Sequence, residues 1–253
     1  MESMATGISM GAMNKIDYDN WQAGLANGFE LQSSGTTAEP KLIFQTPEKL
    51  LAANAVALAA QHITAASRVL TVCRMTHAGG LLAQTLPAWS IGAQVEIKSF
   101  NAFSFWRDIK GYTHTHLTPV HCTMLMQTKN FYTLDLSGVF LTCGSDQVSF
   151  EIIEAFVERG AVFMCNWGMT EVGPVTINTV FDSLHKVNVY RDQALADGTL
   201  MGDRYYCEYR IIDDELWVRG DVCIYDDWFN THDLVAVNAQ GAMYHVGRRQ
   251  SAK

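Results

Sequence analysis

Hydrophobic and polar positions alternate in a regular way between residues 29 and 199. Apolar, β-branched runs such as VLTVCRM, GVFLTCG and AVFMCN are separated by helical patterns such as TPEKLLAANAVALAAQH and EIIEAFVERG. Strands that alternate with helices at this pitch are typical of a parallel sheet covered by helices. The pattern therefore predicts an α/β fold, with a mostly parallel sheet flanked by helices.

After residue 200 the pattern changes to short strand-like runs separated by turn signals. These runs are YYCEYRII, ELWVRG, VCIYD, DLVAVN and AMYHVG. They predict a small antiparallel β subdomain over residues 200–248. The first 28 residues show little periodicity and are expected to form an irregular arm. We therefore divide the chain at 1–28, 29–199, 200–248 and a short end at 249–253.

Composition and charge narrow the classes of function. The 253 residues are 48% hydrophobic and 17% charged, which indicates a folded globular protein. The net charge of −8, without a basic run, argues against nucleic-acid and anionic-membrane partners. No secretory leader or long apolar run is seen, and the six cysteines form no CxxC pair. We expect a soluble cytoplasmic protein with buried free thiols.

Residues 33–41 read SSGTTAEPK and have the chemistry of a phosphate-binding loop. Hydroxyl groups, a glycine backbone and a mobile ammonium can all contact phosphate oxygens. A hydroxyl-rich surface linker is the alternative. The P-loop NTPase pattern does not fit, because Pro40 precedes Lys41 and Leu42 follows it. The candidate phosphate-binding residues are Ser33, Ser34, Gly35, Thr36, Thr37 and Lys41.

Four further motifs follow this segment in a fixed order. They are NWGMTEVG at 166–173, ELWVRG at 215–220, WFNTHDLV at 228–235 and HVGRR at 245–249. Together with SSGTTAEPK they resemble the ordered signatures of the adenylate-forming (AMP-binding) superfamily, of the acyl-CoA synthetase or ligase type. Five ordered matches are far more specific than any one of them.

The resemblance implies roles around ATP and Mg²⁺. The 33–41 segment would hold the β- and γ-phosphates, chiefly through Thr36, Thr37 and Lys41. Thr170 would reach the α-phosphate, and Glu171 would bind the metal. A solvated loop acid is the alternative for Glu171. The resemblance assigns the remaining nucleotide contacts to Gly144, Ser145, Asn166, Trp167, Gly168, Met169, Asp233 and Arg248.

Several of these roles have a structural alternative. Trp167 would stack on adenine or serve as a core tryptophan. Gly144 and Ser145 correspond to a segment beside adenine, whereas Asp146 would instead cap the next helix. Asp233 would accept hydrogen bonds from the ribose hydroxyls, whereas Arg248 would reach the ribose or the α-phosphate. Arg249 is expected to be solvated.

Histidines add a second group of candidates. His77 lies where the family carries a histidine on the acyl path near the reacting carboxylate, although a lone histidine is more often structural. His114, His116 and His121 cluster along the chain. Strand alternation places only His114 and His116 on one face, so a metal site there is not favoured.

The resemblance implies ATP-dependent activation of a carboxylic acid to an acyl-adenylate, with transfer to CoA as a further step. Expected pocket walls at 77–90, 116–126 and 142–145 are rich in Leu, Met and Trp, which suggests an apolar acyl or aryl acid. Two alternatives remain open. One is a non-catalytic nucleotide-binding module, and the other is a split enzyme whose C-terminal domain, or another acyl acceptor, is a separate partner.

The chain departs from the family pattern at several points. Ala38 replaces a glycine of the loop, and His232 replaces a glycine at a position where we expect it to crowd the turn. The sequence ends at Lys253, before the family's mobile C-terminal domain, and Ser251 stands where the hinge aspartate would be. We therefore expect the nucleotide-binding half of such an enzyme, possessing the phosphate loop but not the lysine of the C-terminal domain.

Overall fold

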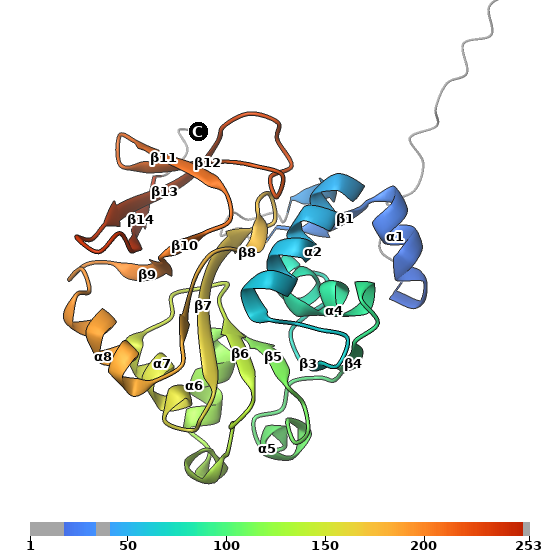
Figure 1. The fold of residues 1–253 in the computed structure, drawn as a ribbon, viewed down its shortest axis with the longest axis vertical. Coiled ribbons are helices and arrows are strands. Elements are labelled where there is room, and N and C mark those ends of the chain that lie inside the picture. The colour runs from blue at the N-terminus through green and yellow to red at the C-terminus, as the bar shows by residue number, and fades with distance from the viewer. Residues whose placement is uncertain (1–17, 34–40, 250–253) are drawn as a thin grey trace, which may run out of the picture.

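The computed structural model of the chain describes residues 18–33 and 41–249. A seven-stranded sheet forms its centre, in the order β10-β8-β7-β6-β5-β3-β4 (Figure 1). The five strands from β7 to β4 run parallel, and β8 and β10 are antiparallel to their neighbours. The α/β class and the mostly parallel sheet are confirmed. The strands are β3 (Arg68–Thr71), β4 (Gln94–Ile97), β5 (His114–Leu117), β6 (Phe140–Cys143), β7 (Val162–Met169), β8 (Gly173–Phe181) and β10 (Arg204–Tyr205).

Helices cover both faces of this sheet (Figure 1). Leu141 and Phe163 point into a core shared with α6, α7 and α8, whereas their neighbours Phe140 and Met164 pack against α2. This alternation follows from the two-residue period of a strand, and burial of both faces explains the continuous apolar runs. The helices are α2 (Pro47–Gln61), α3 (Ala78–Gly80), a π-helical segment (Leu81–Thr85), α4 (Leu86–Ser90), α5 (Phe105–Asp108), α6 (Pro119–Met126), a 3₁₀ helix (Lys129–Thr133), α7 (Phe150–Val157) and α8 (Leu184–Asp192).

The start of α2 follows the expected capping pattern. The Thr46 side chain accepts a hydrogen bond from the Lys49 backbone N–H at 3.3 Å, and Pro47 occupies the first helical position. A threonine at this position satisfies a backbone donor that the helix leaves unpaired, and proline there loses no helical bond.

The N-terminal arm is not irregular throughout. A 3₁₀ turn (Tyr18–Asn20) leads into α1 (Trp21–Asn27), where an irregular segment was expected. Trp21 stacks on Trp89 with ring centroids 6.3 Å apart, and Leu25 packs on the same cluster. Packing against α4, rather than local periodicity, therefore stabilises this short helix.

A second sheet follows the predicted antiparallel pattern. Its order is β11-β12-β13-β14-β9, and all its pairings are antiparallel. The strands are β9 (Thr199–Gly202), β11 (Glu208–Ile212), β12 (Glu215–Arg219), β13 (Phe229–Val237) and β14 (Met243–Arg248).

Two details of the predicted β subdomain are wrong. The run VCIYD at 222–226 forms turns and bends instead of a strand. Val222 and Cys223 are buried there, and the Ile224 N–H donates to the Glu171 carbonyl at 2.9 Å, so the segment packs on a turn of the other subdomain. The short strand β10, in turn, belongs to the large sheet.

Strands β1 (Phe29–Gln32) and β2 (Leu42–Gln45) form a separate two-stranded antiparallel sheet. They flank the 33–41 segment, and Gln32 also makes a parallel bridge with His77. The six cysteines are free thiols; Cys207 is partly exposed and the other five are buried. Within the described ranges, no helix has the length and apolar character needed to cross a membrane.

Candidate nucleotide and acyl site

Two hydrogen bonds between Ser33 and Lys41 close the base of the 33–41 segment. The Ser33 N–H donates to the Lys41 carbonyl at 2.8 Å, and the Lys41 N–H donates to Ser33 Oγ at 3.3 Å. Lys41 is exposed and Ser33 is half-buried. The predicted contacts Ser34, Gly35, Thr36 and Thr37 lie outside the described residues.

The Thr-Glu motif lies beside this base. Thr170 and Glu171 occupy the turn between β7 and β8, and Thr170 is buried. Thr170 Oγ1 donates to the Gln32 carbonyl at 3.4 Å, at the end of β1. Because Gln32 also bridges His77, the structure brings together three segments that the sequence analysis had linked only by resemblance.

A buried lysine donates a hydrogen bond to the Thr170 carbonyl. Lys49 is 2% exposed, and its Nζ donates to the Thr170 carbonyl at 3.0 Å and to Gln45 Oε1. The Gln45 Nε2 donates to the same Thr170 carbonyl at 3.2 Å. Burial lowers the pKa of Lys49 to about 7, although the nearby negative charge of Glu171 acts to raise it.

The sequence analysis missed Lys49. A signal was present, because Lys49 shares a helix face with Ala53, Ala57 and Ala60, which are all buried. An isolated lysine on an apolar helix face is uncommon, and a buried lysine needs partners such as the two oxygens found here.

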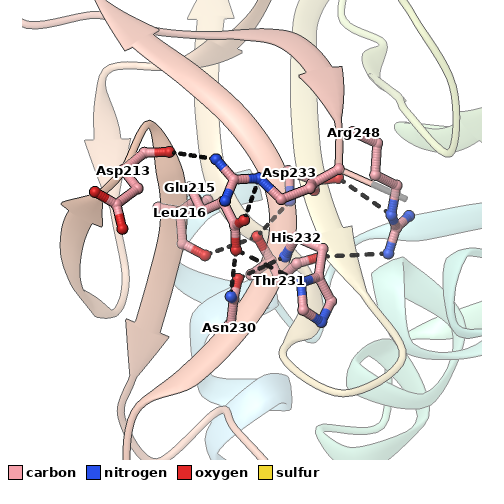
Figure 2. A network of polar contacts seen from close by, with 9 residues as sticks. Asp213, Glu215, Leu216, Asn230, Thr231, His232, Asp233 and Arg248 are labelled. Carbon is pink, nitrogen blue, oxygen red and sulfur yellow. Dashed lines mark hydrogen bonds and ion pairs between the residues drawn. The ribbon is translucent and has the colours of Figure 1, made fainter. Parts of the chain in front are cut away.

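A second group of polar contacts, centred on Asp233, joins the two subdomains. This carboxylate is 4% exposed, and its Oδ2 accepts a hydrogen bond from Trp167 Nε1 at 3.0 Å. Its Oδ1 lies 3.5 Å from His245 Nε2 and 3.6 Å from Arg248 Nε. Arg248 is about half exposed and also donates to the Thr231 carbonyl at 3.3 Å (Figure 2). The structure thus brings Trp167, Asp233 and Arg248 together.

The turn that carries His232 tolerates the missing glycine. His232 adopts a φ of 61°, in the left-handed region that glycine occupies most easily. Its N–H is held by Asn230 Oδ1 at 2.8 Å, and its ring lies 3.5 Å from Glu215 (Figure 2). The expected crowding does not occur, because the histidine side chain projects to a partly exposed position.

Glu215 is a charged residue that the sequence analysis did not single out. It accepts a hydrogen bond from Asn230 (Figure 2). It also lies 2.6 Å from Arg249 Nε. The Asn230 hydrogen bond, with Arg249 and His232 as weaker causes, holds the pKa of Glu215 below its ordinary value. Arg249 is exposed, as expected, and it also pairs with the buried Glu215 carboxylate, which requires a partner.

Neighbouring atoms approach two positions of the site, Gly144 and Gly168, so closely that a side chain would not fit there. A Cβ on Gly144 would lie 2.7 Å from the Asn166 side chain, and one on Gly168 would lie 2.1 Å from the Gly173 carbonyl. Met169 packs with Trp167 on the core cluster of the β subdomain.

The segment after Gly144 does not cap the next helix through Asp146, which was one of the two predicted roles of this segment. Ser145 has a φ of 75°, so it too occupies the left-handed region. The cap of α7 is Ser149, whose side chain accepts from the Ile152 N–H, so Asp146 is not the cap. Asp146 Oδ1 instead accepts from the Gln147 N–H at 2.7 Å.

A cavity of about 640 Å³ opens at the carboxyl ends of β3 and β5. Seven of its lining residues come from the predicted walls: His77, Gly79, Gly80, His116, Thr118, His121 and Ser145. The leucines of the first predicted wall are instead buried in the core. The lining is therefore more polar than predicted, because the leucines of these helical segments pack into the protein core and do not line the cavity. The other lining residues are Val72, Cys73, Arg74, Ile97, Lys98, Ser99 and Phe100.

The three clustered histidines have separate environments. His114 contacts Gln61 and Thr113, whereas His116 contacts the Gly79 carbonyl. His121 accepts from the Thr118 N–H and stacks on Phe100 at 4.0 Å. Across residues 18–33 and 41–249, no three His, Cys, Asp or Glu side chains gather in a way that could hold a metal ion.

These observations define an α/β protein with a cavity at the carboxyl ends of its parallel strands. Residues 31–228 match the family described as AMP-binding enzyme, and the chain belongs to this family.

Individual relatives agree with this membership. The chain is 27% identical over 250 residues to an indoleacetate–CoA ligase of Aromatoleum aromaticum, covering 86% of this chain and 47% of the relative. It is 26% identical over 152 residues to an acyl-CoA synthetase of Gibberella moniliformis, covering 57% of this chain and 27% of the relative. The chain thus spans about half or less of the length of these relatives.

The fold is also found in solved structures. An O-succinylbenzoate coenzyme A synthetase (MenE) from Bacillus subtilis, in complex with AMP, superposes with a TM-score of 0.71 at 20% identity. The match covers 87% of this chain and 49% of that one. At this identity the likeness shows the shared fold.

Proposed function

We propose that this chain forms the nucleotide- and acyl-binding part of an ATP-dependent ligase that activates a carboxylic acid as an acyl-adenylate. The observation that carries the proposal is the meeting of Thr170 and Glu171 with the base of the 33–41 segment and His77, beside a cavity. Family membership and the two CoA-ligase relatives support the same reaction class.

The phosphate side of the site would use the 33–41 segment and the Thr-Glu turn. The exposed ammonium of Lys41 would neutralise the β- and γ-phosphates, and Thr170 would face the α-phosphate. Glu171 fits the Mg²⁺ ion of the nucleotide, because magnesium commonly takes one or two protein carboxylates together with phosphate oxygens and water. Bound there, the ion would offset phosphate charge.

The nucleoside side would use Trp167 and Asp233. The indole would offer a flat face for adenine, and its N–H donates to Asp233, whose carboxylate would accept from the ribose hydroxyls. A carboxylate has about four lone-pair positions, so Asp233 retains acceptor capacity beyond its Trp167 bond. Arg248, half exposed beside Asp233, would contact the ribose or the α-phosphate.

In the proposed reaction a carboxylate oxygen of the acid attacks the α-phosphorus of ATP, and pyrophosphate leaves with its bonding electrons. The protein's task is to spread negative charge on both sides of the phosphorus. His77, which lines the cavity, would orient the carboxylate of the acid. Transfer of the acyl group to CoA, and a C-terminal domain acting in trans, are further parts of this proposal.

Calorimetry with AMP and with Mg-ATP on the purified chain tests the proposal. Lys41→Ala should weaken ATP binding about tenfold or more, the effect of one charge-assisted hydrogen bond, without lowering the melting temperature. Asp233→Asn should weaken AMP binding, whereas Asp226→Asn, which removes the same charge from an exposed loop, should not. Unchanged AMP affinity in Asp233→Asn would contradict the nucleoside assignment.

A second assay separates catalysis from binding. Pyrophosphate exchange should be slow for the lone chain and should rise when a relative's C-terminal domain is added, because a charge placed at the transition state is worth about 3–4 kcal/mol. Nucleotide binding without exchange under either condition would favour the non-catalytic alternative.

A further inference from the structure

Lys49 is a buried lysine to which the proposed reaction gives no direct part. It lies in the first turn of α2, and its Nζ donates to the Thr170 carbonyl at 3.0 Å and to Gln45 Oε1. Lysine is almost never fully buried unless it is paired, because taking its polar group out of water costs free energy. A methionine of similar volume would fill the same space without that cost. Packing alone therefore does not account for a lysine at this position.

The oxygen that Lys49 contacts belongs to the peptide group between Thr170 and Glu171. It accepts hydrogen bonds from Lys49 Nζ and, at 3.2 Å, from Gln45 Nε2, so donors from α2 and from β2 both fix this peptide group. Within the described residues the side chain of Glu171 makes no hydrogen bond or ion pair. The position of its carboxylate therefore follows from the backbone of the turn, which Lys49 and Gln45 hold.

The two residues of the Thr-Glu turn also have separate contacts. The Thr170 side chain donates to the Gln32 carbonyl at 3.4 Å, independently of Lys49. The Glu171 carbonyl accepts from the Ile224 N–H at 2.9 Å. Loss of the Lys49 donor would therefore loosen the peptide group that leads to Glu171, while the Thr170 side chain keeps its own partner. The proposed α-phosphate contact and the proposed metal contact should then respond differently.

We propose that Lys49 is a positioning residue for the nucleotide site: it holds the peptide group between Thr170 and Glu171 in the orientation that Mg-ATP binding requires. The inference rests on the proposed function, because that function assigns Glu171 to the metal of the nucleotide. Lys49 acts through the backbone and does not contact the ligand. The role does not depend on its charge, since an ammonium group and a neutral amine both carry at least two N–H donors.

Replacing Lys49 with methionine removes both hydrogen bonds and keeps a side chain of similar volume. Calorimetry on the full chain should show Mg-ATP binding weakened about tenfold, and AMP binding in chelator changed by no more than about twofold. AMP is spared because the Thr170 side chain retains its bond to Gln32. Lys129→Met, which removes an exposed lysine, is the control and should bind both ligands like wild type. Equal losses for both ligands would show a general structural role and overturn the proposal.

Hydrogen exchange on the nucleotide-free chain reports on the turn itself. The Ile224 N–H is protected by its bond to the Glu171 carbonyl, so its exchange should become about tenfold faster in Lys49→Met. The Leu136 N–H, bonded to the Arg159 carbonyl at 2.7 Å before β6 and β7 begin, should exchange as in wild type. Unchanged exchange at Ile224, or an equal rise at both positions, would contradict the positioning role.

A second variant keeps the proposal testable if Lys49→Met does not fold. Gln45→Met removes the other donor to the Thr170 carbonyl and leaves Lys49 in place. It should weaken Mg-ATP binding more than AMP binding, and equal affinities for both ligands relative to wild type would then overturn the proposal.

The outcomes also separate this inference from the function on which it rests. If AMP and Mg-ATP bind the wild-type chain and bind Lys49→Met as tightly, the proposed function stands and only the role of Lys49 is overturned. If neither ligand binds the wild-type chain, the proposed function fails and this inference fails with it, even where exchange at Ile224 rises.

Discussion

Replacing Lys49 with methionine should change how the stability of this protein depends on pH. The Lys49 ammonium group is enclosed between Gln45 and the Thr170 carbonyl, and its pKa falls from 10.5 to about 7 in the folded chain. A lysine whose pKa is lowered on folding binds more protons in the unfolded state between these values. Stability therefore rises as pH increases from about 7 toward 10.5.

The magnitude follows from the difference between the two pKa values. At 1.36 kcal/mol per pKa unit, the full difference corresponds to about 5 kcal/mol, and the part between pH 7 and pH 10 corresponds to about 4 kcal/mol. Below pH 7 the folded state incurs the whole cost of burying the charge. Above pH 10.5 the neutral amine is present in both states, and the cost is absent.

Urea unfolding at several pH values between 6.5 and 10, in chelator and without nucleotide, measures this effect. Wild type should gain about 4 kcal/mol relative to Lys49→Met over that range, because methionine fills a similar volume and does not titrate. Lys129→Met is the control, since this lysine is exposed, and it should follow the wild-type curve. Parallel curves for wild type and Lys49→Met would refute the reasoning.

Three further predictions concern the site. Glu171→Gln should leave AMP binding in chelator unchanged and weaken Mg-ATP binding, which titrations with and without magnesium can separate; equal loss for both ligands would contradict the metal role. Gly80→Ala should destabilise the fold by about 3 kcal/mol in chemical denaturation, because its Cβ would lie 2.0 Å from the Arg74 carbonyl. Trp167→Phe keeps an aromatic face but loses the hydrogen bond to Asp233. We expect the free energy of unfolding to fall by about 1.5–3 kcal/mol, which lowers the urea concentration at the unfolding midpoint. An unchanged midpoint in Trp167→Phe would show that the indole N–H is not needed.

The fold class was predictable because it depends on local periodicity. Alternating apolar strands and helices require a sheet covered on both faces, and the Thr46–Pro47 pair marks a helix start that the structure confirms. The run VCIYD was misread for the same reason. Its apolar residues indicate burial, but burial beneath the turn at Glu171 and pairing in a sheet look alike in a short sequence.

The sequence by itself determined the order of the motifs, and with it membership of the AMP-binding enzyme family. Only the tertiary structure decided which polar groups meet. Trp167 and Asp233 are 66 residues apart, and Lys49 and Thr170 are 121 apart, so no local pattern links them. Periodicity reports which face of an element is buried, whereas the donor that meets a given acceptor depends on how separate elements pack.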